Sequence, residues 1–185
     1  MISGGELRKG VIIEMEGKLY QVIDYQHVKM KRTALAKVKL RDINAGHTIE
    51  RSFQSTEKLT RARLESRPMQ YLYNDGQFFN FMNTETFEQV PVSEDKMGDA
   101  NLYLKENDVC ELMLYGDEVI GVELPLTVDL AVAETEPGFK GDTATGGSKN
   151  ATLETGLTVQ VPLFIETGTR VRVNTDTNQY IERVN

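Results

Sequence analysis

The sequence lacks the apolar segments that membrane insertion and secretion require. No stretch approaches the roughly 18 to 20 consecutive apolar residues of a membrane-spanning helix, and no apolar segment stands at the N-terminus. With 39% hydrophobic residues over 185 positions, the composition is typical of a soluble, non-secreted protein. We therefore expect a cytoplasmic protein with no membrane partner.

Residues that disulfides, metal sites and catalysis need are also scarce. Cys110 is the only cysteine, which excludes an internal disulfide, and in the alternating run DVCELML we interpret it as a buried strand residue. His27 and His47 have no cysteine or carboxylate neighbours at metal-ligand spacing. No nucleophile–base pair stands out, so the sequence predicts a protein that is not an enzyme and holds neither metal nor cofactor.

Long amphipathic helical patterns are rare, and short strand patterns dominate. Runs that alternate apolar and polar residues, such as LYQVIDY, AKVKLRDI and TRVRVN, are separated by Gly, Asn or Asp turns. The run YLYNDGQFFNFM predicts a hairpin with Asn74, Asp75 and Gly76 at its turn. One short helix is expected from Glu94 to Gly98. The predicted fold class is therefore all-β.

Strands this short favour small β-barrels, because closure removes exposed sheet edges. Three barrels fit the chain, at residues 1–64, 65–127 and 128–185, with seams near Leu64 and at the ELPLTVDL stretch near Pro125. Units of about 60 residues have marginal cores. We therefore expect neighbouring barrels to share an interface.

Charge is divided unevenly along the chain, whose net charge is −7. Residues 1–64 hold 13 Lys/Arg and 7 Asp/Glu, residues 65–127 hold 3 and 13, and residues 128–185 hold 5 and 8. A basic first third joined to an acidic middle predicts a molecule that presents one end to a polyanion. Chance clustering on a solvated face is the alternative.

One segment, YQHVKMKRTALAKVKLRDI, carries much of the basic charge. Its cations are Lys29, Lys31, Arg32, Lys37, Lys39 and Arg41. The first three lie between two strand patterns, and alternation places the last three on one face of the second strand. No Asp or Glu interrupts the stretch from Lys29 to Arg41, whereas solvated hairpins usually mix both signs. We interpret the segment as a hairpin that neutralises nucleic-acid phosphates, with an ordinary solvated hairpin as the alternative.

A glycine-rich stretch, residues 138–149, is superficially similar to a phosphate-binding P-loop. Gly141 and Gly146 have the required separation, but Gly147 stands where the motif needs lysine, and no strand–loop–helix pattern surrounds it. A P-loop is therefore excluded. A loop that approaches another backbone closely and a plain connecting loop stay open as alternatives.

Longer motifs carry a family resemblance. The segment KNATLETGLTVQVPLFIETG, residues 149–168, resembles the C-terminal signature of the bacterial translation elongation factor P family: Lys-x-Ala, four residues, Gly, an apolar V-x-V-P and a closing Gly. Further matches are PGFKGDT, YLYNDG, FMNTETFEQ and the terminal YIERV. Together they span nearly the whole chain.

The resemblance implies an L-shaped molecule of three barrels, in which an SH3-like (KOW-like) domain precedes two OB-fold domains. It implies a monomer that binds the 70S ribosome between the P and E sites, beside the P-site peptidyl-tRNA and near rRNA and ribosomal proteins of the E site. There it would stimulate peptide-bond formation and relieve stalls at consecutive prolines. The tip of the first domain would reach toward the tRNA acceptor end.

The basic hairpin falls at that tip. Contacts to tRNA or rRNA are therefore expected from Lys29, Met30, Thr33, Lys37, Lys39 and Arg41. Many family members have a Pro-Gly-Lys-Gly turn whose lysine receives a post-translational extension, whereas this chain has the shorter run KMKRT. Alignment from the upstream side places Arg32 at the modified position, and alignment from the downstream side places Lys31 there. Arg32 is slightly favoured as the residue that a modifying enzyme would act on.

Two other sets of residues match family positions. Gly141, Asp142 and Thr143 form the GDT loop, which the resemblance places toward the mRNA or anticodon side of the E site. Tyr180 and Arg183 match positions near the C-terminus. Asn150 departs from the family pattern, where proline is more usual.

The alternative function is that of a general OB-fold RNA-binding protein or RNA chaperone. Such proteins bind single strands through stacking aromatic residues and basic grooves, and the acidic second and third segments oppose that interpretation. A small-molecule enzyme ranks third, since it would need a deep pocket with converging titratable groups.

Overall fold

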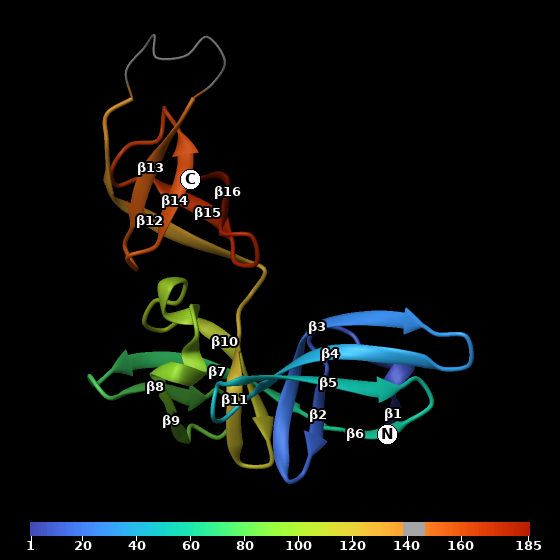
Figure 1. The fold of residues 1–185 in the computed structure, drawn as a ribbon. Helices are drawn as coiled ribbons and strands as arrows, with labels where there is room; N and C mark the ends of the chain where they lie inside the picture. The colour runs from blue at the N-terminus through green and yellow to red at the C-terminus, as the bar shows by residue number, and fades with distance from the viewer. Residues whose placement is uncertain (139–146) are drawn as a thin grey trace. The chain divides into compact units, whose positions relative to one another are not determined.

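The structure, a computed structural model, describes residues 1–138 and 147–185 of the chain. The chain divides into two compact units, Met1–Leu64 and Glu65–Asn185. The strands of the described residues form three antiparallel, curled sheets (Figure 1). The predicted all-β fold class is therefore confirmed.

The first unit contains one sheet with the strand order β1-β6-β2-β3-β4-β5. Its elements are β1 (Ile2–Ser3), η1 (Gly4–Glu6), β2 (Ile12–Met15), β3 (Lys18–Lys29), β4 (Ala34–Asp42), β5 (Thr48–Gln54) and β6 (Lys58–Arg61). Apolar side chains on one face form its core, in which Leu7, Ile13 and Leu40 are fully buried. The two longest strands of this unit, β3 and β4, form the hairpin predicted to be basic.

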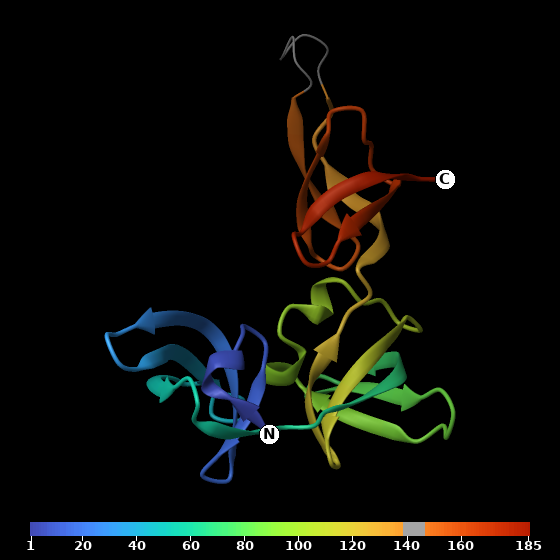
Figure 2. The same ribbon diagram turned by 90° about the vertical axis from the view of Figure 1, so that its right-hand side faces the viewer.

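The second unit begins with a sheet of order β11-β10-β7-β8-β9, here called the central sheet. Its elements are β7 (Glu65–Asn74), β8 (Phe78–Asn83), β9 (Gln89–Ser93), α1 (Glu94–Met97), η2 (Ala100–Leu102), β10 (Val109–Tyr115) and β11 (Glu118–Glu123). The predicted short helix is confirmed as α1, and the segment from α1 to η2 lies over one end of the sheet (Figure 2). Phe81 and Leu112 are fully buried in its core.

The C-terminal sheet of this unit has the order β14-β13-β12-β15-β16. Its strands are β12 (Thr127–Thr135), β13 (Ser148–Leu153), β14 (Thr158–Pro162), β15 (Arg170–Asn174) and β16 (Gln179–Val184). Leu130, Ile165 and Val171 are fully buried at its centre. The predicted division of the chain into three domains stays a prediction.

The hairpin predicted in the central sheet is confirmed. Gly76 has φ of +93°, and its N–H donates to the side-chain oxygen of Asn74 at 2.8 Å. The carboxylate of Asp75 accepts the N–H groups of Gln77 and Phe78 at 2.9 and 2.7 Å. These hydrogen bonds lower the pKa of Asp75, because they favour its charged form.

Cys110 is a buried core residue, as the alternating run predicts. It is 3% exposed within the central core. Burial raises the pKa of its thiol to about 12, since an apolar environment disfavours the thiolate. The thiol is therefore a poor nucleophile at neutral pH.

Within the second unit, Tyr103 joins the two sheets. Its ring packs in the core of the C-terminal sheet, and its hydroxyl donates to the side-chain oxygen of Asn178 at 3.2 Å. Nearby, the Thr155 hydroxyl donates to the carbonyl of Leu102. The central and C-terminal sheets therefore complete one another's burial, as their marginal size requires.

Replacing Tyr103 should destabilise the second unit in two separable steps. Tyr103→Phe removes one hydrogen bond and should cost about 1 kcal/mol. Tyr103→Ala also empties a buried ring site and should cost about 3 to 5 kcal/mol. Urea unfolding of the full chain measures both changes. Equal stability of wild type and Tyr103→Ala would contradict the shared core.

Candidate nucleic-acid interface

The β3–β4 hairpin carries the basic turn at one end of the N-terminal sheet (Figure 1). Pairing is continuous from Lys29 opposite Ala34 to Tyr20 opposite Asp42, apart from a bulge between Val22 and Asp24. On β3, residues 24–27 are exposed although they are paired with β4. Their partners Ala36 and Val38 on β4 are buried, so the hairpin extends beyond the apolar core only from Val28 to Leu35, where backbone pairing keeps it ordered.

Lys31 and Arg32 are the two central residues of the turn. The N–H of Met30 donates to the carbonyl of Thr33 at 3.0 Å, which closes the turn around them. Neither central residue has a positive φ, so the turn needs no glycine at either position. All five residues from Lys29 to Thr33 are exposed. Within residues 1–138 and 147–185, neither Lys31 nor Arg32 forms an ion pair.

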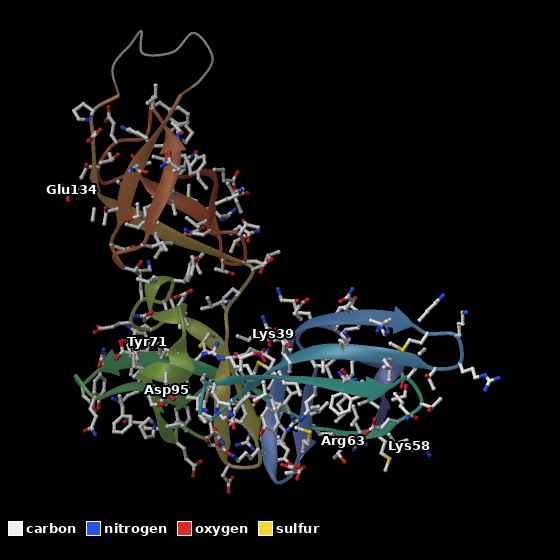
Figure 3. The ribbon with its side chains drawn as sticks, viewed as in Figure 1. Lys39, Lys58, Arg63, Tyr71, Asp95 and Glu134 are labelled. Carbon is white, nitrogen blue, oxygen red and sulfur yellow. The ribbon has the colours of Figure 1, made fainter. Side chains whose placement is uncertain are left out.

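The cations of β4 alternate with buried residues, as predicted. Lys37, Lys39 and Arg41 are exposed, whereas Ala36, Val38 and Leu40 on the opposite face are buried. Figure 3 labels Lys39 among these cations. The period of two along a strand produces this separation. Three positive side chains therefore share the outer face of the strand that leads to the turn.

Neighbouring strands place two acidic residues on that outer face, which the linear sequence did not reveal. Asp24 of β3 and Glu50 of β5 stand directly opposite Lys39, one on either side. These side chains line a shallow groove of about 360 Å³. By contrast, Lys37 lies between Gln26 and Ser52. The positive potential of the hairpin is therefore strongest toward its turn.

A second feature that sequence reasoning missed holds the hairpin stem. The Arg8 guanidinium lies 5.3 Å from the Tyr25 ring centroid, and its Nη1 donates to the Leu7 carbonyl at 2.7 Å. The same Nη1 is 3.1 Å from His27 Nε2. Tyr25 and His27 are both on β3, so Arg8 ties the stem of the hairpin to the segment that follows η1. Cation–π and hydrogen-bond contacts of this kind limit bending at the stem.

Tyr180 and Arg183 are brought to one face of β16 by a bulge. Val171 pairs with Arg183 and Val173 with Tyr180, which leaves Ile181 as the extra residue between two registers. Because paired residues share a face, the three-residue spacing of Tyr180 and Arg183 places both on the same side. Tyr180 packs against the edge of the C-terminal core, and Arg183 is exposed.

A groove of about 840 Å³ adjoins Tyr180 on the C-terminal sheet. Its lining includes Phe164, which is 64% exposed, and the amide side chains of Asn150 and Gln160. Gln160 donates to Asn150. Gly141, Asp142 and Thr143, the predicted GDT loop, lie outside the described residues.

The signature lysine, Lys149, is buried on β13. It is 8% exposed, and its Nζ donates to the carbonyl of Glu136 at 2.6 Å. Gly138 is tightly enclosed nearby, because a Cβ there would lie 2.3 Å from the carbonyl oxygen of Leu163. Both contacts fix the chain on either side of residues 139–146.

Arg172 of β15 binds side chains of both neighbouring strands, β12 and β16. Its Nε and Nη2 donate to the two carboxylate oxygens of Asp129 at 2.8 and 3.2 Å, and its Nη1 donates to Glu182 at 2.7 Å. Hydrogen bonds from Arg172 lower the pKa of Asp129, and its positive charge adds to the effect. The bidentate geometry fixes the strand that carries Tyr180 and Arg183.

The stability of the C-terminal sheet should depend on pH through Asp129. The pKa of Asp129 is lowered in the folded protein, so its ion pair with Arg172 stabilises the sheet fully at pH values above the ordinary carboxyl pKa of 3.8. This stabilisation is lost as the pH falls below that value. Asp129→Asn should therefore lower the urea midpoint at about pH 6 and leave it nearly unchanged near pH 2. Asp176→Asn, which removes an exposed carboxylate of the same sheet, is the control. A deficit of Asp129→Asn that persists at the lowest pH would refute this assignment.

No group of three or more His, Cys, Asp or Glu side chains in residues 1–138 and 147–185 is placed to hold a metal ion. Over the same residues, no helix has the length and apolar character needed to cross a membrane.

Protein-family models match the chain in three consecutive segments. "Elongation factor P (EF-P) KOW-like domain" matches residues 3–59, "Elongation factor P (EF-P) OB domain" matches residues 64–122, and "Elongation factor P, C-terminal" matches residues 128–183. Together they cover more than half of the chain. KOW-like and OB domains are the fold types expected from the sequence.

Full-length relatives and one solved structure are also similar. Elongation factor P of Moorella thermoacetica is 53% identical over 184 residues, covering 99% of this chain and 100% of its own. Elongation factor P of Thermoanaerobacter sp. is 52% identical over 185 residues, covering 100% of both chains. The solved structure of eukaryotic translation initiation factor 5A from Methanococcus jannaschii is similar with a TM-score of 0.51 at 18% sequence identity. The match covers 65% of this chain and 94% of the chain in that structure. That structure is similar in fold.

Proposed function

The chain belongs to the elongation factor P family of translation factors, and from that premise we propose how it acts. It binds the ribosome between the P and E sites, beside the peptidyl-tRNA, and stimulates peptide-bond formation at consecutive prolines. The family consists of translation elongation factors rather than classical enzymes.

The observation that carries the proposal is the exposed, basic turn at the end of the β3–β4 hairpin. Lys31 and Arg32 occupy its centre, and Lys29 precedes them. A turn on an extended hairpin reaches into a narrow space that a whole domain cannot enter. Cations at its end neutralise phosphates and release the counterions condensed on RNA. The acceptor end of the P-site tRNA is the polyanion that we assign to it.

The reaction step needs positioning rather than acid–base chemistry. The ring of proline fixes φ and constrains its amine, so successive prolines hold the peptidyl-tRNA end in an unproductive geometry. A cationic side chain beside that end restores orientation and supplies no proton or nucleophile. Each tenfold gain in rate needs only about 1.4 kcal/mol of additional transition-state stabilisation. A few well-placed contacts from the turn meet that requirement.

The stem contacts support this role because positioning requires a rigid support. Arg8 holds Tyr25 and His27 on β3, and continuous pairing with β4 extends to Lys29. A cation on a loose loop would lose much of its orienting effect as entropy. Lys37 and Arg41 are assigned to tRNA or rRNA contacts along the stem, together with Lys39, Met30 and Thr33.

Removing the turn cations should abolish relief of proline stalls without unfolding the protein. Arg32→Ala and Lys31→Ala each remove an exposed side chain, so circular dichroism and thermal unfolding should stay unchanged. Relief of a polyproline reporter should fall by about tenfold or more in at least one single variant and in the double variant. Lys18→Ala is the matched control, since Lys18 is exposed at the other end of β3. Normal relief in both single variants and the double variant would remove the turn from the mechanism.

Neutralising the acidic neighbours of Lys39 should have the opposite effect on binding. Asp24→Asn combined with Glu50→Gln removes negative charge from a face assigned to RNA. Ribosome affinity should then rise by roughly two- to fivefold at low salt, and the gain should shrink as salt screens it. Equilibrium binding of the labelled full chain measures this change. Weaker binding of the double variant would show that this face does not approach RNA.

The residue modified by a partner enzyme is proposed to be Arg32, with Lys31 as the alternative. Both lie at the centre of the turn and are exposed, so both are accessible to a modifying enzyme. Intact-mass spectrometry of the protein from its native host, followed by peptide mapping, distinguishes the two. An unmodified mass would show that the bare cation acts.

General RNA binding is the second candidate function. The groove beside Phe164 and Tyr180 favours it, because OB-folds bind single strands on aromatic residues. The acidic composition of residues 65–127 opposes it. Binding assays separate the two functions: a chaperone retains many free RNAs, whereas the proposed factor co-sediments with ribosomes and needs P-site tRNA.

A further inference from the structure

One turn is built in the same way in all three sheets. The turn begins with an Asn or Asp at position i. The side-chain oxygen of that residue accepts hydrogen bonds from the backbone N–H groups of residues i+2 and i+3. Its backbone carbonyl accepts a hydrogen bond from the N–H of residue i+4. The three turns are Asp42–Gly46, Asn83–Phe87 and Asn174–Asn178, with hydrogen bonds of 2.8 to 3.1 Å. Because the turn occurs three times, the residues at its last position can be compared with one another.

The last residue of each turn adopts a left-handed backbone conformation. Gly46 has φ of +76°, Asn178 has +58° and Phe87 has +62°. Glycine and asparagine enter this region readily, whereas a bulky aromatic residue there is an outlier. Two of the three turns therefore use a residue suited to the geometry. The turn of the central sheet places a phenylalanine where the backbone disfavours it.

Phe87 gains no compensating burial from the fold. It is 68% exposed and is not among the residues of the central core or those packed against it. The Asn83 hydrogen bonds keep it on a tightly closed turn, so its ring is held outward on a rigid support. A strained and exposed aromatic side chain contributes little to folding, and such outliers cluster at functional sites.

The surroundings of Phe87 are acidic. Glu85 lies on the same turn, Glu88 directly follows Phe87, and both are exposed. Residues 65–127 hold 13 Asp/Glu against 3 Lys/Arg. Carboxylates in this arrangement repel nucleic-acid phosphates and attract cations. A rigid aromatic ring within a charged rim is the arrangement of a protein–protein hot spot.

We propose that Phe87 is the anchor of a protein-docking site that inserts into an apolar socket on a Lys/Arg-rich protein surface. Glu85 and Glu88 pair with the cationic rim of that socket. The site lies on the β8–β9 turn, on a different sheet from the basic turn assigned to tRNA. The inference goes beyond the proposed function, because it assigns a protein surface rather than RNA to the acidic middle of the chain.

The first test separates folding from docking through one substitution. Phe87→Asn installs the residue that the equivalent turn uses at Asn178. It should raise the Tm of the full chain by about 2 to 4 °C, since the left-handed conformation is no longer strained. A lower Tm would show that Phe87 stabilises the fold and would overturn the inference.

The second test measures docking with purified ribosomes that carry P-site tRNA. Phe87→Asn should weaken binding of the full chain roughly 30-fold, as expected for an aromatic hot spot. Phe87→Tyr, which keeps the ring, should bind nearly as well as the wild type. Equal binding of Phe87→Asn and the wild type would refute this inference alone. If the wild-type protein does not bind these ribosomes, both the docking of Phe87 on the ribosome and the proposed function are refuted.

The chemical class of the partner is tested by crosslinking and charge reversal. Benzoylphenylalanine at position 87 should crosslink to a ribosomal protein, identified by mass spectrometry, at a Lys/Arg-rich segment. Glu85→Lys combined with Glu88→Lys should weaken binding and slow association. Crosslinks confined to rRNA or to a second copy of this chain, or tighter binding of the charge-reversed variant, would overturn the assignment to a basic protein.

Discussion

The pairing of β3 with β4 beyond the apolar core is the constraint on which the functional interpretation depends. Backbone hydrogen bonds along this hairpin keep its exposed end ordered where side-chain burial cannot. Its turn closes through the Met30–Thr33 hydrogen bond, and Arg8 holds its stem. Lys29, Lys31 and Arg32 are thereby held at a fixed position beyond the last buried core residue of β4, Ala36. Orientation of a neighbouring RNA end needs this rigidity more than it needs any reactive group.

Much of this arrangement could be predicted from the sequence, because it depends on local patterns. Strict alternation along AKVKLRD places Lys37, Lys39 and Arg41 outside, and the NDG run specifies its own turn through side-chain and glycine geometry. The short helix α1 follows equally local signals. Each of these features is determined by residues that are close together in the sequence.

The remainder depends on register between strands that are distant in sequence. The acidic neighbours Asp24 and Glu50 are opposite Lys39 only because of pairing on both sides of β4. Likewise, Tyr180 and Arg183 share a face only because a bulge shifts the register at Ile181. Phe87 matches a family segment in sequence, but its left-handed backbone and its likeness to the turns ending in Gly46 and Asn178 are visible only in the fold. A linear pattern does not show which distant strands pair or where a bulge shifts their register.

Directed cleavage from the basic turn tests the central claim most directly. Cys110 is buried and its thiol pKa is about 12, so Lys31→Cys provides a selectively reactive thiol for an iron chelate. Hydroxyl radicals from that chelate, with the protein bound to ribosomes that carry P-site tRNA, should cleave the 3′-terminal nucleotides of the tRNA. A chelate at Lys18→Cys should leave those nucleotides intact. Cleavage of rRNA from the Lys31 position with none at the tRNA acceptor end would contradict the account.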